Sequence, residues 1–123
     1  MIHLDANFLI DSLVPGSGRD VQLAGWLSAS ESIGISALAW GEFLCGPLSP
    51  VAEGLARQLL PAPEPITGAD AESAARLFNA TGRRSRNFAD CCIAAVALRT
   101  GSRLATSNSA DFQPFVPHGL VLA

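Results

Sequence analysis

The sequence contains no lysine, and all of its positive side-chain charge comes from eight arginines. A chain without lysine cannot contain a Gly-x-x-x-x-Gly-Lys loop, which excludes a P-loop for nucleotide phosphates. Charged residues of both signs make up only 15% of the chain, against roughly 25% in ordinary soluble domains. Together with 49% hydrophobic residues and a mean hydropathy of +0.31, this excludes a disordered chain and indicates that a partner or second copy covers some apolar surface.

Cysteine and histidine are scarce, which argues against a zinc site. The three cysteines are Cys45, Cys91 and Cys92, an odd number with no Cys-x-x-Cys pair, and the adjacent pair is poorly placed to form a disulfide. The two histidines, His3 and His118, lie near the two ends of the chain. We therefore expect reduced, buried thiols and no Ser-His-Asp catalytic arrangement.

Long hydrophobic runs are also absent. No apolar stretch approaches the ~20 residues that a membrane-spanning helix needs, and the N-terminus lacks the basic start and cleavage site of a signal peptide. A chain of 123 residues is expected to form one domain, over 1–123. We expect a cytoplasmic protein with no membrane partner. The net charge of −3 argues against general coating of nucleic acid by bulk positive charge.

The order of the segments predicts an α/β fold. Short strands are expected at 1–4, 33–35, 104–106 and 119–122, with a marginal edge strand at 65–66. Helices are expected at 6–13, 21–27, 37–45, 51–60, 68–79 and 87–100. Ser36 is the expected N-cap of one helix, and Thr67 with Asp70 resembles a capping box for another. Strands separated by helices predict a mostly parallel sheet with helices on both faces.

Four acidic residues lie where such a sheet places a ligand, beyond the carboxyl ends of its strands. They are Asp5 after the first strand, Glu42 in the 37–45 helix, Asp90 in the first turn of the 87–100 helix, and Asp111 after the 104–106 strand. Three of them have structural explanations that weigh about equally with a functional one. Asp5 can be an N-cap, Asp90 can form a capping box with Asn87, and Asp111 can close an Asx turn near Asn108.

Two of these acids interrupt apolar helices. Glu42 shares a helix face with Leu38 and Cys45, and Asp90 is the only charge between Asn87 and Leu98. Buried carboxylates need a cation or strong donors, and converging carboxylates repel one another unless a divalent ion neutralises them. Oxygen ligands of this kind select Mg²⁺ or Mn²⁺, which activate water for attack on a phosphodiester.

A basic segment, Arg83-Arg84-Ser85-Arg86, directly precedes the 87–100 helix. Such a cluster is most often a solvated loop. Its position beside Asp90 also suits the binding of a nucleic-acid backbone, because guanidinium groups bind phosphate through two hydrogen bonds.

Four short motifs, in this order, resemble the PIN-domain family and particularly the VapC ribonuclease toxins of bacterial toxin–antitoxin pairs. They are Leu4-Asp5-Ala6-Asn7, Trp40-Gly41-Glu42-Phe43, Asp90-Cys91-Cys92-Ile93-Ala94-Ala95, and Ala105-Thr106-Ser107-Asn108-Ser109-Ala110-Asp111-Phe112. No single motif is specific, but all four together span nearly the whole chain. The resemblance implies a three-layer α/β/α fold with a five-stranded sheet in the order 3-2-1-4-5.

The resemblance also implies a function: Mg²⁺-dependent cleavage of RNA, with Mn²⁺ able to substitute. Asp5, Glu42, Asp90 and Asp111 would be the catalytic and metal-binding acids. Asn7 and Thr106 would support them, and Asn108 holds a position that is acidic in some relatives. Arg83, Arg84 and Arg86 are the candidate RNA-binding residues. A homodimer and an inhibitory antitoxin protein are the implied partners.

Two other hypotheses remain at this stage. One is a catalytically silent PIN-like module that binds RNA or a protein, against which the retention of all four acids speaks. The other is a phosphatase with Asp5 as covalent nucleophile, which would require an acid where the chain has Asn7 and a lysine that it lacks.

Overall fold

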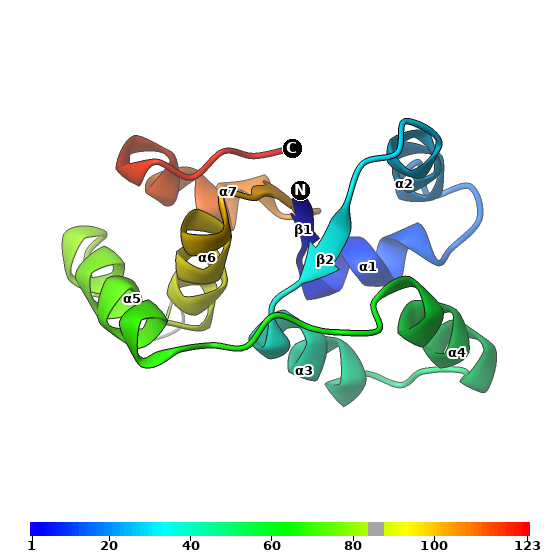
Figure 1. Ribbon diagram of the computed structural model, residues 1–123, viewed down its shortest axis with the longest axis horizontal. Helices are drawn as coiled ribbons and strands as arrows, with labels where there is room; N and C mark the ends of the chain where they lie inside the picture. The colour runs from blue at the N-terminus through cyan, green and yellow to red at the C-terminus, as the bar shows by residue number, and fades with distance from the viewer. Residues whose placement is uncertain (84–87) are drawn as a thin grey trace.

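The protein folds around a short parallel sheet. The computed structural model describes residues 1–83 and 88–123. Among these residues the sheet has three strands in the order β2-β1-β3, namely β1 (Ile2–Leu4), β2 (Ile33–Ile35) and β3 (Arg103–Ala105) (Figure 1). The central strand is fully buried, and the predicted α/β class with a parallel sheet is confirmed.

The register of the sheet brings three strand ends to one level. Leu4 pairs with Ile35 on one side and with Ala105 on the other. The next residue of each strand, Asp5, Ser36 or Thr106, therefore lies at the same carboxyl edge of the sheet.

The outer two of the five predicted strands are reduced to single bridges. Glu64 pairs with Ser36 beside β2, and Leu122 pairs with Leu104 beside β3, so the expected order is kept but the expected length is not. Pro63 and Pro65 flank Glu64 and have no N–H group to donate. Only Glu64 itself pairs with the edge of β2, through 2.8 and 2.7 Å hydrogen bonds.

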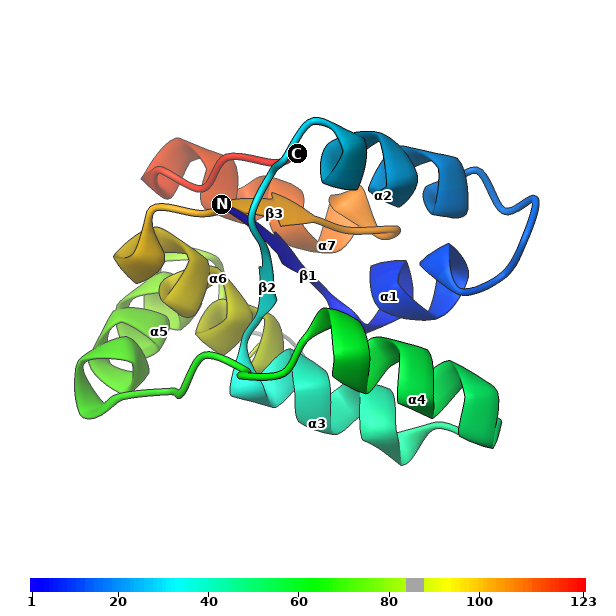
Figure 2. The same cartoon turned by 45° about the vertical axis from the view of Figure 1, so that its right-hand side comes forward.

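Helices cover both faces of the sheet (Figure 2). They are α1 (Ala6–Ser12), α2 (Arg19–Ser28), α3 (Ala37–Cys45), α4 (Pro50–Leu59), α5 (Gly68–Ala80), α6 (Phe88–Thr100), α7 (Ser109–Phe112) and the 3-10 helix η2 (Gln113–His118). In both ribbon views α5 and α6 lie on one side of the strands, and α1, α2 and α4 lie on the other. None of the helices in the described residues is long and apolar enough to span a bilayer.

The helix starts follow the predicted capping signals. The Ser36 hydroxyl accepts the N–H of Ala39 at 3.1 Å, and Thr67 and Asp70 form the predicted capping box. The sequence did not predict α7 or η2, which together occupy 109–118. A four-residue helix is too short to show an apolar period.

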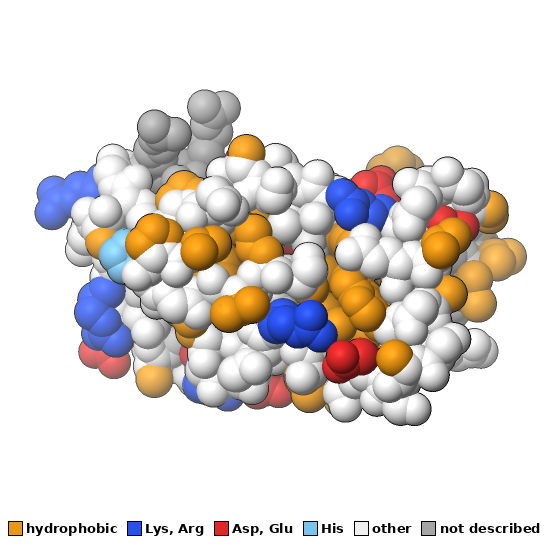
Figure 3. All heavy atoms as spheres, turned by 90° about the horizontal axis from the view of Figure 1, so that it is seen from above, with side chains coloured by type: hydrophobic (Ala, Val, Ile, Leu, Met, Phe, Trp, Pro, Cys, Tyr) orange, Lys and Arg blue, Asp and Glu red, His pale blue; other side chains and the backbone are white. Residues whose placement is uncertain are grey.

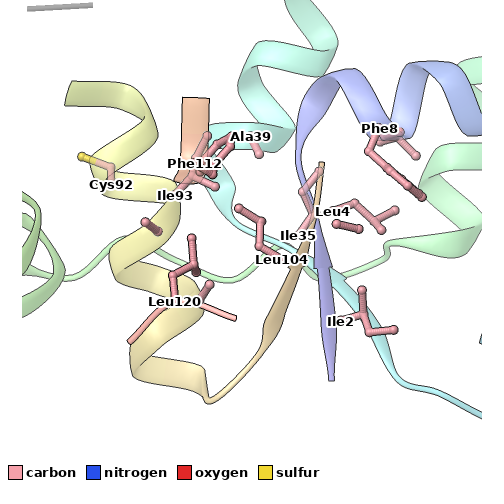
Figure 4. Packing of buried hydrophobic residues seen from close by; sticks show 14 of the residues in the cluster. Ile2, Leu4, Phe8, Ile35, Ala39, Cys92, Ile93, Leu104, Phe112 and Leu120 are labelled. Atoms are coloured by element: carbon pink, nitrogen blue, oxygen red, sulfur yellow. The ribbon is translucent and has the colours of Figure 1, made fainter. Parts of the chain in front are cut away.

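The core is centred on α6, which is buried from Cys91 to Ala97. Its alanines allow close packing against the sheet, and Ile93 lies among Leu104, Phe112 and Leu120 in Figure 4. Two of the three cysteines are buried as predicted, and all three are free thiols. Cys45 is exposed, so the expectation of burial was wrong there, because it lies at the end of α3, outside the core.

A partly buried ion pair joins α5 to α6. Asp70 is 2% exposed, and Arg99 Nε donates to both of its carboxylate oxygens, at 2.9 and 3.0 Å. Arg99 also donates to Glu64 Oε1 at 3.0 Å. Burial alone would raise the pKa of Asp70, but the hydrogen bonds from Arg99 and Thr67 hold it below its ordinary value.

This pair should contribute stability that depends on pH. At pH 7 we expect Asp70→Asn to lower the free energy of unfolding by about 2 kcal/mol, because Arg99 loses its charged partner. The loss should begin to shrink below about pH 4, where Asp70 of the unfolded chain becomes protonated, and should disappear once the pH falls below the lowered pKa of folded Asp70. Urea unfolding at both pH values measures it, with exposed Glu72→Gln on the same helix as control. Equal losses at the two pH values would contradict the electrostatic account.

Candidate metal centre

The four predicted acids line one cleft at the carboxyl edge of the sheet. The cleft encloses about 280 Å³. Its walls come from the start of α1, from α3, from the first turns of α6, and from the segment around α7. The lining residues are Asp5, Ala6, Asn7, Ile10, Glu42, Asp90, Ile93, Asn108, Asp111 and Phe112.

Asp5 both caps α1 and faces the cleft. It is 5% exposed, and its Oδ1 accepts the N–H of Phe8 at 2.7 Å. Its Oδ2 accepts a hydrogen bond from the hydroxyl of Thr106, at the end of the neighbouring strand. Burial raises the pKa of Asp5, although these two hydrogen bonds oppose the rise. The capping role and the functional role proposed for Asp5 are therefore compatible.

Asn108 connects two of the acids. Its backbone N–H donates to the hydroxyl oxygen of Thr106 at 2.9 Å, so it helps to orient the group that holds Asp5. Its side-chain Nδ2 donates to Asp111 Oδ2 at 2.6 Å. Asp111 lies within α7 rather than in a loop, and the contact with Asn108 joins the two side chains.

Glu42 is exposed, which corrects the prediction of a buried carboxylate. The core face of α3 is formed by Ala39 and Phe43, each of which follows directly after Leu38 or Glu42 in the sequence. Glu42 nevertheless lines the cleft. Partial desolvation against the cleft wall, followed by the negative charge of Asp5, raises the pKa of Glu42.

Asp90 experiences the field of the other three acids. It is partly buried in the first turn of α6, and its burial raises its pKa to about 6, with further contributions from Asp111, Glu42 and Asp5. Asn87, its expected capping partner, lies outside the described residues. The raised pKa of Asp90 therefore has two causes, first its burial and then the negative charges of the other three acids.

The donor set fits a divalent cation chemically. Carboxylate and amide oxygens are hard ligands that suit Mg²⁺ or Mn²⁺, and a cation would offset the burial and the repulsion that together raise the pKa of Asp90. Within 1–83 and 88–123, no three acidic, histidine or cysteine side chains converge closely enough to hold one ion. The acids surround the cleft without closing on a single point.

Of the three arginines predicted to bind RNA, the structure describes Arg83. Arg83 is exposed just beyond α5, with φ 57°, and is not among the lining residues. Arg84 and Arg86 lie outside the described residues.

The sequence reasoning missed the apolar wall of the cleft, which consists of Ile10, Ile93 and Phe112. A signal was present for two of them. Ile10 follows Asn7 by three positions and Ile93 follows Asp90 by three, a spacing that places both residues of each pair on one helix face.

Comparison with known proteins identifies the family. Residues 2–113 match the PIN domain, and the chain therefore belongs to the PIN domain family. This confirms the resemblance drawn from the four motifs. No match was found among curated proteins.

Solved structures share the fold over the full length of the chain. A chain of FitAB bound to an IR36 DNA fragment has a TM-score of 0.70 at 20% identity, with 100% of this chain and 94% of that chain covered. FitAcB from Neisseria gonorrhoeae has a TM-score of 0.73 at 22% identity, with 100% and 97% covered. VapBC2 from Rickettsia felis, bound to a DNA fragment from their promoter, has a TM-score of 0.72 at 18% identity, with 100% and 98% covered.

The repulsion at Asp90 should be measurable as stability. Because its folded-state pKa of about 6 lies above the ordinary value, ionised Asp90 destabilises the fold above pH 6 and costs nothing once it is protonated in both states. We expect Asp90→Asn in metal-free buffer to raise the free energy of unfolding by about 1 kcal/mol at pH 8, after discounting for solvent screening, and to leave it unchanged near pH 3.5. Urea unfolding at the two pH values measures this. A variant less stable than wild type at pH 8 would show that the favourable helix-dipole interaction of Asp90 outweighs the repulsion.

Proposed function

We propose that this protein is a Mg²⁺-dependent endoribonuclease that acts as the toxin of a VapBC-type toxin–antitoxin system. The observation that carries the proposal is the meeting of four acids from separate segments around one cleft. The pKa of Asp90 is raised by burial and by the other three acids, which supports the proposal that the cleft binds a cation.

Each residue of the cleft has a role in this proposal. Asp5, Glu42, Asp90 and Asp111 would hold Mg²⁺, or Mn²⁺ in its place. The ion, when bound, activates water and neutralises charge at the phosphodiester. The Thr106 hydroxyl keeps one oxygen of Asp5 in a fixed orientation.

The supporting residues around the acids complete the site. Asn108 holds Thr106 through its N–H and Asp111 through its side chain. Asn7 contributes an amide to the cleft wall. Arg83, Arg84 and Arg86 would contact the RNA backbone beyond the start of α6.

The partners follow from the structural relatives and from the surface. FitAB and VapBC2 share the fold, and by that likeness we propose a cognate antitoxin that covers the acidic cleft, and a homodimer in the cytoplasm. Apolar side chains remain exposed on the surface, among them Ile10 at the cleft, Val14 and Leu44. Figure 3 shows that hydrophobic side chains gather in patches on one face of the molecule, as expected for a chain whose surface is partly covered by partners.

A catalytically silent PIN-like module that binds RNA or a protein is the second candidate. The observation that favours it is that both oxygens of Asp5 already accept hydrogen bonds within the chain. A test of metal-dependent cleavage separates the two functions.

The cleavage test uses Glu42, because this acid is exposed and makes no capping bond. We expect Glu42→Gln to lower the rate of Mg²⁺-dependent cleavage at least about 100-fold while leaving the melting temperature unchanged, because a metal ligand is lost from a rigid site. The substrate is a pool of RNAs of randomised sequence, so that a narrow sequence preference is not missed. Cleavage is read by sequencing the product ends, and chelation by EDTA should abolish it.

The matched control is Glu72→Gln on the exposed face of α5, which should cleave like wild type. Equal cleavage by wild type and Glu42→Gln would exclude Glu42 from the site. Binding of RNA without cleavage in Mg²⁺ and in Mn²⁺ would favour the silent module.

A further inference from the structure

The negative charge of the cleft repels the negatively charged backbone of RNA. Every phosphate of RNA is negatively charged, and the charged residues that line the cleft are also all acidic. A bound ion would neutralise the phosphate at the reacting bond, but the flanking phosphates need cations from the protein. On the face shown in Figure 3 the arginine side chains that are coloured stand apart from one another and form no continuous patch.

The arginines in the described part of the chain differ in burial and in whether a carboxylate already neutralises their charge. Three of them already form ion pairs: Arg57 with Glu53, Arg99 with Glu64 and Asp70, and Arg103 with Glu31. Arg76 and Arg83 are exposed. Arg19 alone among the arginines at 1–83 and 88–123 is partly buried and has no carboxylate within ion-pair distance.

Contacts with Phe8 and Gln22 hold the guanidinium of Arg19 in place, and neither contact neutralises its positive charge. Arg19 is the first residue of α2, and its Cζ lies 5.5 Å from the centroid of the Phe8 ring. Trp26, two turns further along α2, stacks on the same ring at 5.5 Å. The side-chain Nη1 of Arg19 donates to Gln22 Oε1 at 3.0 Å. A stacked guanidinium that keeps further N–H groups is suited to binding a phosphate.

The backbone at Arg19 is fixed by the loop that joins α1 to α2. The Ser17 hydroxyl donates to the carbonyl of Asp11 at 2.6 Å and accepts the N–H of Arg19 at 3.2 Å. The Asp20 carboxylate accepts the N–H of Gly16 at 2.9 Å. The entry to α2 is thereby tied to the end of α1, and Arg19 keeps a constant position relative to that helix.

Arg19 also acts on the acidic cleft. The Phe8 ring beneath it belongs to the helical turn that Asp5 caps, since the Phe8 N–H donates to Asp5. Burial and the nearby charge of Asp11 raise the pKa of Asp5, while the positive charge of Arg19 lowers it.

We propose that Arg19 binds a backbone phosphate of RNA on the α1–α2 side of the acidic cleft, and so positions the strand across it. This inference rests on the proposed ribonuclease function, because it names a substrate contact of the same site. It adds a binding residue outside the basic segment at 83–86.

The test measures RNA affinity as a function of salt. Both proteins carry Glu42→Gln to prevent cleavage, and one also carries Arg19→Met, which keeps an unbranched side chain over Phe8 but removes the charge. Fluorescence anisotropy follows the binding of a labelled single-stranded RNA pool in Mg²⁺ between 50 and 300 mM NaCl. We expect about a fivefold to tenfold loss of affinity, and a slope of log K against log salt that is shallower by about 0.7, the value for one phosphate contact on single-stranded RNA.

Arg76→Met in the same background is the matched control. Arg76 also lies on a helix and donates to a side chain three positions away, Ser73, but it belongs to α5, on the other side of the strands from α1 and α2. It should change neither affinity nor slope. Arg19→Lys should keep the slope, because it keeps the charge.

The outcomes separate this inference from the proposed function. An unchanged slope for Arg19→Met, with RNA still bound, overturns the role of Arg19 and leaves the ribonuclease proposal standing. A lower melting temperature with an unchanged slope assigns Arg19 to packing on Phe8 and also overturns it. If Glu42→Gln binds no RNA while the wild-type protein cleaves none, both proposals fail.

Discussion

Repulsion between like charges is the constraint on which this structure depends, because four carboxylates surround one small cleft. The raised pKa of Asp90 reports that repulsion, after burial, as the joint effect of Asp111, Glu42 and Asp5. A chain would move such groups apart unless its backbone held them. The parallel sheet provides that constraint, because three adjacent strands end at one level and direct their following residues to the same edge.

The rigidity of the site comes from two sources of different kinds. The first is the bonded series in which Asn108 donates to Thr106 and Thr106 donates to Asp5, which links two strand ends and orients a carboxylate. The second is α6, whose buried surface from Cys91 to Ala97 fixes its first turn, and with it Asp90, against the sheet. These contacts fix Asp5 and the first turn of α6, but a bound ion would still have to draw the acidic side chains together, because within 1–83 and 88–123 no three of them converge closely enough to hold it.

The sequence predicted those features that depend on local patterns. The three strands, the caps at Ser36 and Thr67, and the gathering of the four acids all followed from short apolar runs, capping residues and the geometry of parallel sheets. The burial of Glu42 was predicted wrongly, because α3 is apolar on most sides and its sequence does not show which face meets the core. The outer strand beside β2 is shorter than predicted, because the prolines on both sides of Glu64 have no N–H group to donate. The position of Arg19 over Phe8 is a tertiary contact between two helices, for which no local pattern exists.

The central claim is that acids distant in the sequence form one metal site. Water-proton relaxation with Mn²⁺ tests it most directly, comparing the wild-type protein with Glu42→Gln, Asp111→Asn and the control Glu72→Gln. The account predicts that the wild type and the control bind Mn²⁺, and that each of the two cleft variants, from different segments of the chain, loses binding. Failure of the wild type to bind at millimolar Mn²⁺, or undiminished binding by both cleft variants, would contradict it.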